Sequence, residues 1–125
     1  MPYPIIIGRN EKEKKELGDK GLAYIGKSYV KFANTSSLSN YILLDIAKPH
    51  KILIAGKTGS GKSYSMGVLA EEVINAPEEV RKNISILILD TMGIFFSMKY
   101  PNEKQRDELL AWGLEPKGMD VKVYI

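Results

Sequence analysis

The stretch from Gly56 to Ser63, Gly-Lys-Thr-Gly-Ser-Gly-Lys-Ser, holds the residue types that grip a polyphosphate. It fits the phosphate-loop pattern G-x-x-x-x-G-K-[ST] at every fixed position. Glycine has no Cβ atom, so such a backbone can curl with its N–H groups pointing inward around an anion. In this pattern the Lys62 ammonium group contacts the β- and γ-phosphates, and the Ser63 hydroxyl ligates the Mg²⁺ that bridges them. The stretch predicts binding of ATP with Mg²⁺.

All eight residues of this stretch, called the phosphate loop below, are candidate nucleotide contacts, and Lys62 is the candidate catalytic residue. They are Gly56, Lys57, Thr58, Gly59, Ser60, Gly61, Lys62 and Ser63. The alternative is a glycine-rich turn that fits by chance, which average glycine usage makes a roughly one-in-several-hundred event in a chain this long. A strand-like run before the loop and a helix-like run after it favour the nucleotide interpretation.

The elements that must position the loop form a strand, loop, helix, strand series. Residues 52–55 are an apolar run that predicts a short buried strand. Residues 63–74 carry Met66, Leu69, Ala70 and Val73 at helical spacing, and Pro77 stops that helix before one further turn at residues 78–82. Residues 84–89 predict a second strand, covered on both faces. This order is typical of a βαβ unit with a parallel sheet.

Asp90 ends the second predicted strand and is the second candidate metal ligand, beside Ser63. Phosphate-loop enzymes need a carboxylate at a strand end to hold Mg²⁺ or its water. Two alternatives stay open: Asp90 caps the following turn, or it contacts the nucleotide pocket without touching the metal. The lone histidine, His50, is interpreted as a packing or surface residue, because the sequence places no partner carboxylate beside it.

The first 49 residues predict a small β-rich lead segment, similar to part of a barrel, with a domain boundary near Pro49. Four short runs have strand composition: residues 5–7, 22–25, 29–32 and 41–46. Three stretches read as loops or turns: residues 9–20 (a solvated loop or helical turn), 26–28 (a hairpin turn) and 34–40. After the strand predicted over residues 84–89, residues 102–113 predict a helix that opens with a capping box. Residues 121–125 begin another predicted strand.

Composition sets the broad class. The 125 residues make one small domain or part of one, without cysteine, without a secretory leader and without an apolar run near the roughly 18 residues of a membrane span. A cytoplasmic protein with no membrane partner is expected. The net charge of +3 comes from the lead segment, but three surplus charges do not separate a DNA-facing surface from a solvated one.

Residues 50–63, His-Lys-Ile-Leu-Ile-Ala-Gly-Lys-Thr-Gly-Ser-Gly-Lys-Ser, resemble the start of the ATPase domain in the HerA/FtsK group of DNA-pumping motors. In that group the next strand ends in an Asp-x-x-Gly-Glu-Tyr-like segment. Asp90 and Gly93 match it, whereas Ile94 stands where the group has its glutamate and Phe95 stands where it has tyrosine. The resemblance covers residues 50–96 well. HerA-like proteins also carry a small β-barrel ahead of the ATPase core, which is similar in kind to the lead segment.

The resemblance implies a RecA-like fold, with residues 50–125 as the amino-terminal part of an incomplete ATPase domain. It also implies a ring of identical subunits and ATP hydrolysis coupled to movement along double-stranded DNA. The group's main Mg²⁺-site Asp-Glu pair and its arginine finger lie further downstream. This 125-residue chain is therefore expected to bind nucleotide with little turnover.

Two other functions remain open from the residues alone. One is a small nucleotide-binding or phosphoryl-transfer protein, such as a kinase, complete as written. Against it, Arg81 and Arg106 are the two arginines after the loop, and neither lies in a glycine-flanked segment suited to a lid. The other is a module that holds nucleotide without turning it over.

Overall fold

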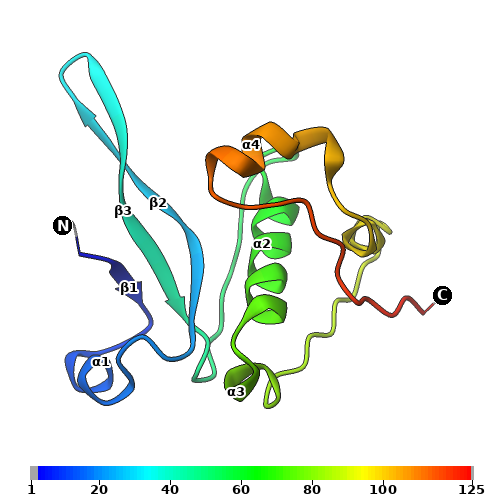
Figure 1. Cartoon of the computed structure of the whole chain (residues 1–125), viewed down its shortest axis with the longest axis horizontal. Coiled ribbons are helices and arrows are strands. Elements are labelled where there is room, and N and C mark those ends of the chain that lie inside the picture. The colour runs from blue at the N-terminus through cyan, green and yellow to red at the C-terminus, as the bar shows by residue number, and fades with distance from the viewer. Residues whose placement is uncertain (1–2, 125) are drawn as a thin grey trace. The chain divides into compact units, whose positions relative to one another are not determined.

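A computed structural model describes residues 3–124 (Figure 1). The chain forms two compact units, one running to Ile86 and the other beginning at Leu87, and each is described by itself. The lead segment, the phosphate loop and the helix after it lie in the first unit. Asp90 lies in the second. The boundary near Pro49 stays a prediction.

A mixed three-stranded sheet forms most of the lead segment. Its strands are β1 (Ile5–Ile7), β2 (Leu22–Phe32) and β3 (Thr35–Asp45), in the order β1-β3-β2. β1 runs parallel to β3, with Ile6 opposite Leu43, and β2 runs antiparallel to β3. The predicted strand at residues 5–7 is confirmed, and the α/β class is confirmed by this sheet and the helices of the chain. The RecA-like parallel sheet stays a prediction.

The position of the hairpin turn differs from the expectation. Residues 26–28 do not turn the chain, because β2 continues through them with register shifts on either side of Gly26 and Lys27. The chain reverses at Ala33 and Asn34, where Ala33 has a φ of +50°. The predicted loop at residues 34–40 was wrong as well, since β3 begins at Thr35. A glycine inside a strand often marks a bulge, and pairing with β2 overrides the weak strand propensity of the Ser/Thr run.

The mixed-charge stretch after β1 contains α1 (Glu11–Leu17), a seven-residue helix. Asn10 and Glu13 form a reciprocal capping box: the Asn10 side chain accepts from the Glu13 N–H at 2.9 Å, and the Glu13 carboxylate accepts from the Asn10 N–H at 2.8 Å. Each bond satisfies a backbone donor that has no partner within the helix. Arg9, expected in a solvated loop, is instead buried.

The helix after the phosphate loop is α2 (Lys62–Asn75), and one further turn, α3 (Glu78–Arg81), follows Pro77. Both predictions are confirmed to within a residue or so. α2 lies beside the β2–β3 pair, and Ala70 is its buried residue (Figure 1). Ala23 of β2 and Leu44 of β3 complete the small core of this unit.

The two strands predicted on either side of α2 are not formed. Residues 51–55 and 84–90 belong to no helix or strand, and no strand among the described residues pairs with them. Leu53 is 91% exposed, and Leu87 and Leu89 are each 86% exposed. An apolar run signals a tendency to be buried, but a strand exists only where a neighbour supplies the ladder hydrogen bonds.

The second unit contains η1 (Phe95–Lys99), η2 (Glu103–Gln105) and α4 (Arg106–Ala111). The predicted helix over residues 102–113 is therefore a 3-10 turn followed by a short α-helix. Asn102 donates to the Gln105 side chain at 2.8 Å and caps no backbone N–H. Gly113, with a φ of +72°, follows the helix as expected of a glycine stop. Residues 121–124 form no strand, and Ile125 lies outside the described residues.

Within residues 3–124, every helix falls short of the length and apolar character that a membrane crossing demands.

Candidate functional site

The backbone of the phosphate loop takes the curled course that its glycines predict. Gly59 and Gly61 have φ values of +78° and +87°, in the left-handed region where a Cβ atom is strained. At Gly56 a Cβ would lie 2.4 Å from the Ser60 hydroxyl oxygen, so a larger residue there would force that hydroxyl to rotate away. The Ser60 N–H donates to the Lys57 carbonyl at 3.2 Å and closes the turn.

Lys62 is the first residue of α2, and its side chain bends back over the loop. Its ammonium nitrogen donates to the carbonyl oxygens of Gly56 and Lys57, each at 2.8 Å. A lysine held in this way places a fixed positive charge inside the curl of the backbone. The helix begins at the same point, so the partial positive charge of its N-terminus adds to that of Lys62.

Ser63 follows on an exposed face of the first helical turn. Its hydroxyl makes no hydrogen bond with any other residue between 3 and 124, whereas the Ser65 hydroxyl donates to the Gly61 carbonyl at 3.2 Å. The first turn of α2 carries no acidic residue, and Glu71 and Glu72 lie in its second half. Burial, and the charge of Glu72, raise the pKa of the Glu71 carboxyl. The start of the helix is therefore free of nearby negative charge on its own element.

Asp90 adopts the turn-capping geometry that was one of the three interpretations of this residue. One carboxylate oxygen accepts from the Phe95 N–H at 2.7 Å, and the other accepts from the Met92 N–H at 3.3 Å. These bonds fix the turn that leads into η1. Among the described residues, no group of three or more His, Asp or Glu side chains is arranged to hold a metal ion. A metal-binding role for Asp90 stays a prediction.

The donor set of the loop fits a Mg²⁺ ion that arrives with a nucleotide. Mg²⁺ is usually held by one or two protein oxygens together with phosphate oxygens and water, and not by a cage of side chains. The Ser63 hydroxyl is exposed beside the Lys62 charge and supplies one such oxygen. A cluster of carboxylates is not needed for that mode of binding.

A second polar cluster, unforeseen from the sequence, lies just ahead of the loop. Asp45 at the end of β3 has a fully buried side chain and pairs with the equally buried Arg9 guanidinium at 2.7 Å. His50 Nε2 lies 2.9 Å from the other Asp45 oxygen. Burial alone would raise the pKa of the Asp45 carboxyl, but hydrogen bonds from His50, Arg9 and the Ala47 N–H outweigh it and lower the pKa. The histidine therefore does have a carboxylate partner, five residues before it in the chain.

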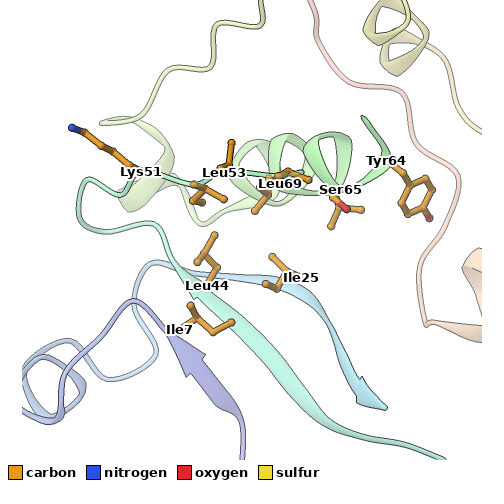
Figure 2. Close-up of a pocket in the computed structure, with 11 residues that line it drawn as sticks. Ile7, Ile25, Leu44, Lys51, Leu53, Tyr64, Ser65 and Leu69 are labelled. Carbon is orange, nitrogen blue, oxygen red and sulfur yellow. The ribbon is translucent and has the colours of Figure 1, made fainter. Parts of the chain in front are cut away.

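An open apolar groove of about 540 Å³ lies between α2 and the sheet (Figure 2). Figure 2 shows Ile7, Ile25 and Leu44 on the sheet side, with Leu69 of α2 opposite them. Residues 51–54, which lead to the phosphate loop, line the same groove. The segment that enters the loop and the helix that leaves it thus share one apolar surface with the lead segment.

Comparison with protein families returns a match over residues 24–119 to the family described as "Helicase HerA, central domain". Neither the curated proteins nor the solved structures returned a match. The matched range takes in the β2–β3 hairpin, the phosphate loop, α2 and Asp90, which is most of the chain. The resemblance expected from residues 50–96 is confirmed and extends beyond them in both directions. The chain belongs to the HerA helicase central-domain family.

Proposed function

We propose that the chain binds Mg·ATP through the phosphate loop and forms the nucleotide-binding part of a HerA-like ATPase. The observation that carries the proposal is the placement of Lys62. Its ammonium group is held 2.8 Å from two loop carbonyls at the start of a helix whose first turn bears no acid. This fixed positive charge, together with the partial positive charge of the helix N-terminus, suits the β- and γ-phosphates of a nucleotide.

In this proposal each part of the loop has a separate task. The glycine backbone cradles the phosphates, Lys62 neutralises charge on the β- and γ-phosphates, and the Ser63 hydroxyl holds the metal. A Mg²⁺ ion held by the Ser63 hydroxyl would supply Lewis-acid stabilisation of negative charge on the phosphates. Asp90 is proposed as a second oxygen ligand of that metal or of its water, since each of its carboxylate oxygens accepts one N–H and keeps a further lone pair.

We further propose that the family activity is ATP hydrolysis coupled to movement along double-stranded DNA or to its unwinding, in a ring of identical subunits. Membership of the HerA family supports this proposal. By itself the 125-residue chain should bind nucleotide but turn it over slowly, below about 1 s⁻¹, the low end of typical enzyme rates. The reason is that Ile94 stands where the group has a glutamate, and an isoleucine cannot orient the attacking water.

The test is calorimetric titration of Mg·ATP into the chain and into a Lys62→Ala variant. Hydrogen bonds to charged groups are worth about 1.5–3 kcal/mol, so the variant should bind at least about tenfold more weakly. Lys104→Ala, an exposed lysine in η2, makes the same change in net charge and should bind as the wild type does. Unchanged affinity in a folded Lys62→Ala variant would refute the phosphate-loop assignment.

Ser63→Ala separates the metal from the phosphates. Because the hydroxyl is proposed as a metal ligand, its loss should weaken ATP binding in the presence of Mg²⁺ and leave binding in EDTA nearly unchanged. Equal weakening under both conditions would show that Ser63 contacts a phosphate and not the metal.

A further inference from the structure

The phosphate loop is tied to the lead sheet by one polar contact on each flank. Ahead of the loop, His50 Nε2 lies 2.9 Å from an oxygen of Asp45, the last residue of β3. Behind it, the Glu72 carboxylate of α2 accepts the Tyr24 backbone N–H of β2 at 2.7 Å. The chain therefore leaves the sheet, makes the loop and returns to the sheet between two fixed points.

The first of these points is rigid because Asp45 cannot move alone. One of its oxygens accepts from Arg9 Nε at 2.8 Å and from the Ala47 N–H at 3.3 Å. The rest of the Arg9 guanidinium donates to main-chain carbonyls, those of Gly18 at 2.7 Å, Gly21 at 3.2 Å and Lys20. Moving the Asp45 carboxylate away would leave the buried guanidinium without its counter-ion, which is strongly destabilising.

His50 is the link between this rigid point and the loop. Its side chain is 26% exposed, and the imidazole packs against Gly8, where a Cβ would come within 3.0 Å of the ring. Residues 51–55 then run to Gly56 without a partner strand to guide them. In a conventional sheet, ladder hydrogen bonds would hold this segment. Here the described contacts that hold it are the imidazole and the apolar groove.

We propose that His50 is a positioning residue for the phosphate loop: by its bond to Asp45 it fixes the start of residues 51–55 and so keeps the loop in its nucleotide-binding conformation. This inference rests on the proposed function for the role of the loop, but not for the anchoring itself. It assigns the lead segment a direct part in nucleotide affinity, because β3 supplies the carboxylate and the turn after β1 supplies the arginine.

The experiment compares His50→Ala with His50→Gln in the full chain. A glutamine amide nitrogen can replace Nε2 as a donor to Asp45, whereas alanine cannot. If losing the anchor leaves the competent loop about one-tenth populated, the Kd for Mg·ATP rises about tenfold. We expect that rise for His50→Ala and a Kd within about threefold of wild type for His50→Gln. Met119→Ala, which removes a buried side chain of the second unit, controls for general destabilisation.

Hydrogen exchange without nucleotide provides the second measurement. The amides of Ser60 and Ser65, which donate to the Lys57 and Gly61 carbonyls, should exchange faster in His50→Ala than in wild type and at the wild-type rate in His50→Gln. Unchanged exchange in His50→Ala, or an equal rise in Met119→Ala, overturns the positioning role. Faster exchange in a chain whose wild type binds no nucleotide supports the anchoring and refutes the proposed function instead. Faster exchange with an unchanged Kd overturns the link to nucleotide affinity.

Discussion

The lead segment and the two apolar runs before and after α2 differ in whether their backbone and polar groups have hydrogen-bond partners. In the lead segment, β2 and β3 pair along their lengths, and even a buried arginine has its carboxylate and carbonyl partners. Residues 51–55 and 84–90 are more uniformly apolar, yet they remain unpaired and leave leucines almost fully exposed. Hydrophobic composition therefore did not decide which segments became strands. A partner for the backbone did.

The largest loss of unfolding free energy should come from removing the negative charge of Asp45, the counter-ion of Arg9. Asp45→Asn leaves the Arg9 guanidinium buried without its counter-ion, which typically costs about 3–5 kcal/mol of unfolding free energy. Urea denaturation at pH 7 measures it. Lys12→Ala, which breaks the exposed Lys12–Glu16 pair, is the control and should cost less than about 0.5 kcal/mol. A cost below about 1 kcal/mol for Asp45→Asn would contradict the importance of the buried pair.

The same carboxylate should make stability depend on pH in the acid range. The folded state lowers the pKa of Asp45 below its ordinary value of 3.8, so the unfolded chain binds the proton first. The contribution of Asp45 is therefore complete above about pH 5 and is lost as the pH falls through the folded pKa. In urea titrations, the wild type and Asp45→Asn should converge as the pH drops toward 3. A constant difference from pH 7 to pH 3 would contradict this sign.

Two leucines that line the same groove allow a matched comparison between a buried residue of a paired strand and an exposed residue of an unpaired segment. Leu44 of β3 is 8% exposed, whereas Leu53 in the unpaired run is 91% exposed. Leu44→Ala should lower the unfolding free energy by about 2 kcal/mol, near the low end for buried leucines because the groove is open. Leu53→Ala should change it by less than about 0.5 kcal/mol. Equal costs would show that residues 51–55 are packed as tightly as a paired strand.

A smaller change should come from the hydroxyl of Tyr24, which is buried and has no hydrogen-bond partner among the described residues. Its ring meets Tyr41 edge to face, with the centroids 5.3 Å apart. Burial is also the main cause that raises the pKa of Tyr24. Tyr24→Phe keeps the ring contact and removes the unsatisfied group, so it should stabilise the chain by about 1 kcal/mol in thermal denaturation. A loss of stability would indicate that the hydroxyl has a bonding partner.

The smallest effect should come from Glu71, which is partly exposed and whose pKa is raised by burial and by Glu72. A raised carboxyl pKa means that the folded state holds the proton longer, so stability is greatest below the ordinary value of 4.5 and falls as the pH rises through the folded pKa. Glu71→Gln should therefore stabilise the chain by a few tenths of a kcal/mol at pH 7 and not at pH 4, since solvent screens the group. Stabilisation that is equal at both pH values would rule out titration as the cause.

The sequence predicted those features that short-range signals determine. Gly56, Gly61, Lys62 and Ser63 define the phosphate loop. The helical spacing of Met66, Leu69, Ala70 and Val73 defines α2, and Pro77 ends it. The predicted hairpin turn was wrong because glycine at position 26 is typical of a turn. The pairing of β2 with β3 instead determines where the chain reverses. Local propensity is a weak guide where contacts between distant residues compete with it.

The Arg9–Asp45–His50 cluster could not be found by the same means. Arg9 and Asp45 are 36 positions apart, and no spacing rule connects them. The Asp45–His50 separation of five residues was visible, but the chain between them contains Pro49 and has no regular period that would bring the two side chains together. The strand predicted over residues 41–46 already contained Asp45, but the sequence did not show that β1 pairs with β3 in the register that sets Ile7 beside Leu44 and so brings Arg9 near Asp45.

The 36-residue separation of Arg9 from Asp45 also bears on the order of events in folding. Its guanidinium needs acceptors from Gly18, Lys20, Gly21 and Asp45, and burying it before they are assembled would leave a desolvated, unpaired charge. The cluster should therefore close after the transition state, with φ-values near zero at Arg9 and Asp45. Substitutions there would accelerate unfolding and leave the folding rate almost unchanged, so the cluster would set the lifetime of the native state and not the speed of its formation.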